Sequence, residues 1–270
     1  MKHAIQKYRI QPGAKVKLSD YDPGDTSGAD NKDEAEASLP KLIRRAAELQ
    51  NVLYAEGKQS LLVVLQAMDA AGKDGTISHI FSGINPQGCS VTSFKAPSKE
   101  DLAHDFLWRV HRVTPAKGMI GIFNRSHYED VLIVRVHNLV PKQVWKKRYD
   151  HINAFEDLLS DNQTKIVKFF LHISKDEQKE RLEARIADKS KHWKVNPDDL
   201  VERQHWDEYM EAYEDVLSKC STSQAPWYVV PANKKWYRNY FISHVLVNTL
   251  EEMNPSYPEA ETDVSNLVVK

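Results

Sequence analysis

The feature that most constrains the fold is an apolar run that breaks into a small-residue loop at residues 61–76. Residues 61–65 are all Leu or Val, as expected of a strand buried on both faces of a parallel sheet. The loop after them carries Gly72-Lys73, and helical spacing then resumes. Such a unit can direct backbone N–H groups, a helix N-terminus and a lysine ammonium at one anion. We therefore predict a phosphate-binding loop here.

The loop departs at two positions from the common pattern G-x-x-x-x-G-K-[ST]. Ala67 stands at the first glycine, and Asp74 stands where a hydroxyl normally holds Mg²⁺. Asp69 is then the candidate replacement ligand for a metal. The loop residues expected to meet the anion are Ala70, Ala71, Gly72, Lys73, Asp74, Gly75 and Thr76. The competing interpretation is an ordinary strand-to-helix turn with a solvated lysine.

Composition limits the class of protein and its partners. With 270 residues, 41% of them hydrophobic, the chain can bury one sizeable core, and we expect one domain with an insertion. Lys and Arg number 37 against 38 Asp and Glu, so an anionic substrate must meet a local basic cluster, and broad nucleic-acid binding is not expected. The distant Cys89 and Cys220 make neither a disulfide framework nor a zinc site, which fits a reducing cytoplasm. The absence of a long apolar run predicts no membrane partner.

Strands and helices are expected to alternate along the chain. A helix is expected over 34–56, where apolar residues fall at helical spacing. Strands after the first are expected at 89–94, 119–124, 166–173 and 227–230, with helices between them. This alternation predicts an α/β fold in which helices cover both faces of a parallel sheet. Ligands of such sheets bind beyond the carboxyl ends of the strands, where each motif below begins.

The chain divides into three parts. Residues 11–36 mix Pro, Gly, Asp and Ser and then turn acidic, which is typical of an irregular segment. We assign an N-terminal arm to residues 1–34, one domain to 35–255 and a C-terminal tail to 256–270. The arm is a candidate for packing on a neighbouring subunit.

A second group of polar residues, 124–130, follows the strand at 119–124. Arg125 can clamp the oxygens of a transferring phosphoryl group, and the carboxylate of Asp130 can hold Mg²⁺. The alternative is a helix start, because Ser126 with Glu129 three residues later has the form of a capping box. That alternative leaves Arg125 and Asp130 unexplained.

A third group follows the strand at 166–173. Ser174 is a plausible N-cap, and Arg181, Arg185 and Lys189 then recur every four residues along one helix face. A row of cations beside a phosphate site predicts a helical lid at about 175–205, which closes over charge and excludes water. The alternative is a solvated helix with pairs such as Glu177 with Arg181.

Three further cations are weaker candidates. Lys95 follows the strand at 89–94 and can reach phosphate, although a solvated lysine explains it equally well. Arg109 and Arg112 lie on an expected helix whose other residues face the core, and they are candidates for the acceptor pocket.

Over residues 35–255 the chain resembles the second family of polyphosphate kinases. The resemblance rests on four ordered motifs: Asp69-Ala70-Ala71-Gly72-Lys73-Asp74-Gly75-Thr76, Phe94-Lys95-Ala96-Pro97, Phe123-Asn124-Arg125-Ser126-His127-Tyr128-Glu129-Asp130, and Arg181-Leu182-Glu183-Ala184-Arg185 with Lys191-His192-Trp193-Lys194. It implies a thymidylate-kinase-like P-loop kinase fold of three layers with a helical lid. It also implies Mg²⁺, with Mn²⁺ as a possible substitute, and a homo-oligomer, either a dimer or a tetramer.

The resemblance also assigns roles to residues. Catalytic roles fall on Asp69, Lys73, Arg125 and Asp130. The loop from Ala70 to Thr76 and the lid cations Arg181, Arg185 and Lys189 would bind polyphosphate. The metal would be held by Asp69 and Asp130. Together with the residue-based candidates Lys95, Arg109 and Arg112, we expect Asn124 and Glu129 to bind the nucleotide, and Glu129 to be a further metal ligand.

The chain departs from the commonest form of the 124–130 motif. Asn124 stands where the family usually has an aspartate, and Glu129 where it usually has an asparagine. The loss of the first carboxylate argues against a direct metal-binding role there. The combination resembles the branch that accepts nucleoside monophosphates as well as diphosphates.

The resemblance implies reversible, Mg²⁺-dependent phosphoryl transfer from polyphosphate to AMP, ADP or both, with adenine or guanine nucleotides as partners. Transfer would be in line, without a covalent enzyme intermediate. The first alternative is an ATP-dependent nucleotide or nucleoside kinase of the same fold. The second is a non-catalytic module that binds nucleotide or polyphosphate.

Overall fold

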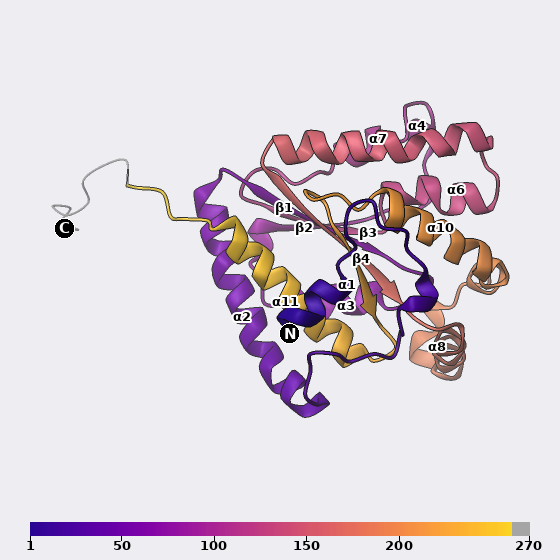
Figure 1. Ribbon diagram of the computed structural model, residues 1–270, viewed down its shortest axis with the longest axis horizontal. Helices are drawn as coiled ribbons and strands as arrows, with labels where there is room; N and C mark the ends of the chain where they lie inside the picture. The colour runs from indigo at the N-terminus through magenta and orange to yellow at the C-terminus, as the bar shows by residue number, and fades with distance from the viewer. Residues whose placement is uncertain (261–270) are drawn as a thin grey trace.

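The computed structural model describes residues 1–260, which form one five-stranded sheet with helices on both sides (Figure 1). The strands are β1 (Ser60–Gln66), β2 (Cys89–Ser93), β3 (Ile120–Asn124), β4 (Thr164–His172) and β5 (Trp227–Pro231). The α-helices are α1 (Lys2–Tyr8), α2 (Lys32–Glu56), α3 (Lys73–Ile80), α4 (Lys99–Leu102), α5 (Trp108–His111), α6 (Ile133–Val136), α7 (Lys142–Asp161), α8 (Lys175–Ala187), α9 (Asp198–Glu202), α10 (Trp206–Lys219) and α11 (Lys235–Met253). Short 3₁₀ helices are η1 (Leu18–Asp20), η2 (Pro86–Gly88), η3 (His127–Val131), η4 (Lys189–Lys194) and η5 (Arg203–His205).

The strand order β2-β3-β1-β4-β5 places β1 at the centre of the sheet, and every pairing is parallel. All seven residues of β1 are buried, as its run of Leu and Val predicts. The five expected strands are all present, with ends that differ by at most two residues from those predicted. After β1 the chain forms β2 and β3 on one side of it, and then β4 and β5 on the other side. The carboxyl end of β1 therefore lies at a topological switch point, where ligands of such sheets bind.

Helices cover both faces of the sheet, which confirms the predicted three-layer α/β fold. Figure 1 shows α2 and α11 side by side on one face and α7 on the other, with α10 nearby. The helix predicted at 34–56 begins slightly earlier, at Lys32, because Asn31 caps it by accepting a hydrogen bond from the N–H of Glu34 (2.9 Å). It ends at Glu56, and its C-cap Gly57 has a φ of +63°, which suits a residue without a Cβ.

Much of the predicted N-terminal arm packs on the rest of the same chain. The first residues form α1, and the side chains of Tyr8 and Ile10 are buried in the core. The N–H of Ile10 donates to the carbonyl of Trp227 on β5 (2.9 Å), and Tyr237 on α11 donates to the carbonyl of Ser27 (2.7 Å). Burial of these apolar side chains joins residues 1–34 to the domain. Most of the predicted tail, residues 261–270, lies outside the described residues.

Two further features bear on the predicted partners. Within residues 1–260, no helix combines the length and the apolar character needed to cross a membrane. Cys89 and Cys220 are both free thiols.

Candidate active site

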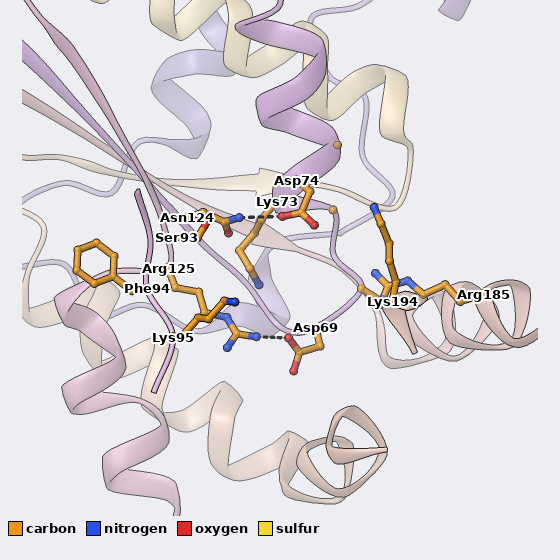
Figure 2. A pocket seen from close by; sticks show the side chains of 13 residues that line it. Asp69, Lys73, Asp74, Ser93, Phe94, Lys95, Asn124, Arg125, Arg185 and Lys194 are labelled. Carbon is orange, nitrogen blue, oxygen red and sulfur yellow. Dashed lines mark hydrogen bonds and ion pairs between the residues drawn. The ribbon is translucent and has the colours of Figure 1, made fainter. Parts of the chain in front are cut away.

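A cavity of about 430 Å³ opens at the carboxyl ends of β1, β2 and β3 (Figure 2). Its wall combines five cations with two carboxylates and the backbone of the loop after β1. The lining residues are Asp69, Ala70, Gly72, Lys73, Asp74, Gly75, Ser93, Phe94, Lys95, Asn124, Arg125, Arg185 and Lys194. Most of the residues predicted from the loop and from the strand ends therefore meet in one place.

The loop after β1 turns sharply before α3. Ala70 has a φ of +63° although it is not a glycine, and Gly72, the N-cap of α3, has a φ of +105°. The left-handed region costs free energy for a residue with a Cβ, so its use at Ala70 is typical of a functional turn held by its surroundings. Thr76 is fully buried and donates its hydroxyl to the carbonyl of Gly72 (3.1 Å). The expectation that Thr76 meets the anion is corrected accordingly.

Lys73 lies beneath this loop, with only 8% of its surface exposed. Its Nζ donates to the carbonyl of Ala67 at 2.8 Å. Burial lowers the pKa of Lys73 to about 8, with a further contribution from the Arg125 guanidinium, while Asp69 opposes the shift. Burial thus disfavours the charged ammonium, and an anion in the cavity would stabilise it.

Arg125 and Asp69 face each other across the mouth of the cavity, as the dashed line in Figure 2 shows. The distance from Arg125 Nη2 to Asp69 Oδ1 is 2.5 Å. Burial lowers the pKa of Arg125, but the carboxylates of Glu129 and Asp69 outweigh it and raise the pKa above the usual value. Arg125 also has a positive φ, +61°, directly after β3. The backbone therefore turns at the residue whose side chain pairs with Asp69.

Asn124 occupies the position where the resembling family usually has an aspartate. Its Nδ2 donates to Asp74 Oδ1 at 2.8 Å. The amide therefore joins the end of β3 to the start of α3, which a carboxylate could not do beside Asp74 without repulsion. On the same side of the cavity, Lys95 is exposed, and its carbonyl accepts a hydrogen bond from Arg109 (2.8 Å).

The region 175–205 is helical, as predicted for a lid. Ser174 caps α8 by accepting a hydrogen bond from the N–H of Glu177 (3.1 Å). Arg185 and Lys194 line the cavity from this side, opposite Arg125 and Lys95 in Figure 2. Arg185 Nη1 also lies 3.6 Å from a carboxylate oxygen of Asp199. Lys189 is exposed and does not line the cavity.

Arg181 requires a correction, because its guanidinium is directed at the protein and not at the cavity. Its three nitrogens donate to one carboxylate and four backbone carbonyls: Glu177, Ala70, Ala71, Ala232 and Asn233. A guanidinium has five N–H donors, and these five bonds use all of them. Arg181 therefore braces the phosphate loop in this structure, and no donor remains for polyphosphate.

Asp130 and Glu129 lie beside the cavity but do not line it. Asp130 Oδ1 accepts from Arg148 (2.9 Å), and its Oδ2 lies 3.9 Å from Arg109. Burial raises the pKa of Asp130, although Arg148 and Arg109 oppose the shift. Arg112 lies over the ring of Trp108 (4.5 Å) and is also outside the cavity wall.

The capping-box interpretation of Glu129 is wrong. Ser126 does act as an N-cap, but of the 3₁₀ helix η3, by accepting a hydrogen bond from the N–H of Tyr128 (3.2 Å). Glu129 instead accepts from Gln66 Nε2 (3.3 Å), at the end of β1. The carboxylate thus faces the carboxyl ends of the strands, where a substrate would bind.

Sequence reasoning missed several residues that shape the site. Ser93 and Phe94 line the cavity because β2 ends there, and Lys194, which the sequence places only in the motif of the lid region, reaches it from η4. Phe94 and Lys194 belong to the quoted motifs, which could have identified them. Arg238 on α11 carries no such signal, since only tertiary packing brings it to the loop, where it donates to the carbonyl of Ala71 (3.2 Å).

The donor groups at this site fit a metal that takes only part of its coordination from protein. Among residues 1–260, no cluster of three or more His, Cys, Asp or Glu side chains could enclose a metal ion. One oxygen of Asp69 is paired with Arg125, and the side chain is partly exposed beside the cavity. Mg²⁺ is commonly held by one or two carboxylates together with substrate phosphates and water, so this donor set fits it.

The parallel α/β fold, with a lysine-bearing loop after its central strand and a cation-lined cavity, defines a phosphotransferase of the P-loop kind. Residues 29–258 match the family Polyphosphate kinase 2 (PPK2). The chain belongs to the polyphosphate kinase 2 family.

Individual relatives cover nearly the whole chain. The AMP/ADP-polyphosphate phosphotransferase of Meiothermus ruber is 54% identical over 98% of this chain and 100% of its own length. The ADP-polyphosphate phosphotransferase of Rhodopseudomonas palustris is 47% identical over 96% of this chain and 94% of its own. The crystal structure of Polyphosphate Kinase 2 from Arthrobacter aurescens TC1 superposes with a TM-score of 0.91 at 47% identity, covering 94% of this chain and 92% of that one. The predicted kinase fold is thereby confirmed.

Proposed function

We propose that this protein transfers phosphoryl groups from inorganic polyphosphate to AMP and to ADP in a reversible, Mg²⁺-dependent reaction. The observation that carries the proposal is the concentration of positive charge around one loop: Lys73, Lys95, Arg125, Arg185 and Lys194 line a single cavity. The chain as a whole has a formal net charge of −1, so this charge is local. Such a field is what a polyanionic donor requires.

The two sides of the cavity suggest which substrate binds where. The lid side presents Arg185 and Lys194, whose long side chains suit a polyphosphate chain that extends away from the loop. The side formed by the ends of β2 and β3 presents Lys95 and Asn124, with Arg109 behind them, and suits the nucleotide. The printed names of the Meiothermus and Rhodopseudomonas relatives support AMP and ADP as acceptors.

The residues at the mouth of the cavity suit in-line transfer. Lys73 and Arg125 would neutralise the oxygens of the transferred group, which is the main task of a protein in this reaction. Asp69 would hold Mg²⁺, with Asp130 and Glu129 as further candidates on the nucleotide side, and Mn²⁺ as a possible substitute. The metal would supply additional charge neutralisation on phosphate oxygens.

One coupled assay tests the proposal. Purified protein with Mg²⁺ and long-chain polyphosphate should convert AMP to ADP and ADP to ATP, and chelation of the metal should stop both reactions. A requirement for ATP as donor, with no turnover on polyphosphate, would show an ATP-dependent nucleotide kinase instead. Tight binding of polyphosphate with no turnover of either donor would show a binding module.

We also propose a cytoplasmic location and a homo-oligomer, either a dimer or a tetramer. The two free thiols, Cys89 and Cys220, suit a reducing compartment. The balanced net charge argues against nucleic acid as a partner. Light scattering on the purified chain measures the subunit number directly, and a monomeric mass would contradict the second part.

A further inference from the structure

Arg238, on α11, is a buried cation without a carboxylate partner among residues 1–260. Its side chain is 2% exposed. Its nitrogens donate to the carbonyl of Ala71 (3.2 Å) and to Asn239 Oδ1 (3.1 and 2.9 Å), which are both neutral groups. Among residues 1–260, no carboxylate oxygen lies within 4.0 Å of it. Arg181, the other arginine behind the loop, differs because its Nε donates to Glu177 (2.6 Å).

Arg238 lies against the inner side of the phosphate loop. A Cβ placed on Gly72 would come within 2.0 Å of Arg238 Nη1, and one placed on Gly75 would lie 3.6 Å from Nη2. The same two glycines line the cavity on their other side. Only the loop backbone therefore separates the guanidinium from the space where a phosphate would bind, at the N-terminus of α3.

An unpaired buried charge is costly for the folded protein. Burial, together with the neighbouring Arg181, lowers the pKa of Arg238 to about 10, which leaves it protonated at neutral pH. On the cavity side, burial and the neighbouring Arg125 also lower the pKa of Lys73, although Asp69, Glu129 and Asp74 oppose the shift. The loop thus has a buried cation on each of its sides, and the one on the inner side, Arg238, has no carboxylate partner among residues 1–260. This arrangement is stabilised when a polyanion occupies the cavity.

We propose that Arg238 is a positioning residue for the polyphosphate donor, whose negative charge compensates that of the guanidinium through the loop backbone. The proposal rests on the proposed function, because it takes polyphosphate as the occupant of the cavity. Arg238 acts in two ways. It holds the carbonyl of Ala71 on the inner side of the loop, and it adds positive potential to the N-terminus of α3.

The test compares Arg238→Gln with Arg45→Gln. Arg45→Gln also removes one positive charge. Arg45 lies on α2, pairs with Glu251 and is not part of the cavity lining. Polyphosphate binding is measured by calorimetry without nucleotide, and the KM for AMP and ADP is measured separately. We expect Arg238→Gln to weaken polyphosphate binding by about tenfold or more and to change nucleotide KM less than about twofold. Arg45→Gln should change neither.

The thermal midpoint of the protein without ligand gives a second readout. A buried charge that only a bound polyanion compensates should not stabilise the ligand-free protein. We therefore expect Arg238→Gln to unfold at about the wild-type temperature or above it. Polyphosphate should raise the midpoint of wild type far more than that of the variant. Arg238→Lys keeps the charge and should bind polyphosphate within about threefold of wild type, and it provides the test if Arg238→Gln does not fold.

The decisive quantity is the affinity for polyphosphate. If Arg238→Gln binds polyphosphate as tightly as Arg45→Gln, the inference is overturned, whatever the thermal midpoints are. Equal weakening of polyphosphate and nucleotide binding would also overturn it, since this indicates a general structural role. If the wild-type protein does not bind polyphosphate, the proposed function itself is contradicted. This outcome is distinguishable from a failure of the inference about Arg238, in which wild type and Arg238→Gln bind equally well.

Discussion

Lys73 shows how a single residue at this site balances burial against charge. Its ammonium is nearly enclosed and its pKa is lowered to about 8, mainly by burial. The charged form is therefore present below about pH 8 and is lost above it. Since kcat/KM reports groups of the free enzyme, this titration should appear in kcat/KM for polyphosphate.

We expect kcat/KM for polyphosphate to fall as the pH rises through about 8, because the neutral amine no longer attracts phosphate oxygens. The measurement is a pH profile of initial rates with polyphosphate varied and nucleotide saturating. Lys73→Arg provides the control, because a guanidinium does not titrate in this range, and the fall should move to higher pH. The same profile in wild type and in Lys73→Arg would exclude Lys73 as the titrating group.

Glu129 is the residue at which specificity for the acceptor can be tested. Its carboxylate contacts Gln66 and takes no part in the cap of η3. We expect Glu129→Asn to reduce kcat/KM for AMP much more than for ADP, because a monophosphate lacks the second phosphate that could substitute for the lost charge. Rates with both acceptors are measured on the same folded preparation.

The control for Glu129→Asn is a cap far from the cavity. Asn31→Ala removes the N-cap of α2 and should lower the free energy of unfolding by about 0.5–2 kcal/mol. It should leave the ratio of AMP to ADP activity unchanged. An unchanged ratio in Glu129→Asn as well would show that Glu129 does not select the acceptor.

At the scale of the element, the first half of α8 is bound to the phosphate loop, whereas its last turn contacts η4 and the segment that contains Asp199. Gln178 donates to the carbonyl of Asp69 (3.0 Å), and Arg181 binds the next two carbonyls of the loop. Beyond these residues, Arg185 lines the cavity and lies 3.6 Å from a carboxylate oxygen of Asp199. The predicted lid movement would therefore begin after Arg181, in the last turn of α8 and in the segments that follow.

Arg185→Ala and Arg181→Ala should have different effects for this reason. We expect Arg185→Ala to raise the KM for polyphosphate more than that for nucleotide, with a difference that shrinks as salt screens the charge. Arg181→Ala leaves loop carbonyls without donors and should lower thermal stability and kcat with both substrates. Steady-state kinetics at two salt concentrations, with a thermal melt of each variant, measure both. Identical kinetic changes in the two variants would contradict this division of α8.

At the scale of the whole molecule, a buried ion pair connects the sheet and a helix that covers it to the segment beside the site. Lys168 on β4 binds Glu156 on α7, Tyr128 on η3 (2.8 Å) and the carbonyl of Cys220 (2.7 Å). His127 also contacts Glu156 (3.2 Å). Burial raises the pKa of Glu156, but Lys168 outweighs it and lowers the pKa below its usual value. The network holds the segment that carries Glu129 and Asp130.

We expect Lys168→Met to lower the free energy of unfolding by about 3–5 kcal/mol, because it leaves the buried carboxylate of Glu156 without its lysine partner. The double variant Lys168→Met/Glu156→Gln should recover part of this loss, since it removes the orphaned charge. Denaturation in urea measures both. A double variant less stable than the single one would show that the charges do not act as a pair.

Much of the architecture could be predicted from the sequence, because local patterns decide it. The run of Leu and Val at 61–65 predicts a strand buried on both faces, and the small residues around Gly72-Lys73 predict a phosphate-binding loop after it. The ends of parallel strands share one edge of the sheet, so Asp69, Asn124 and Arg125 could be expected to meet before their distances were known.

The tertiary structure alone decided what lies behind the loop and which way long side chains turn. Helical spacing put Arg181 and Arg185 on the same face, yet packing against the loop carbonyls uses all donors of Arg181 and leaves Arg185 for the cavity. Arg238 lies about 165 residues from the loop it supports, and no local pattern links the two. Hydrogen-bond partners and desolvation depend on contacts distant in sequence, whereas strands and turns depend on neighbouring residues.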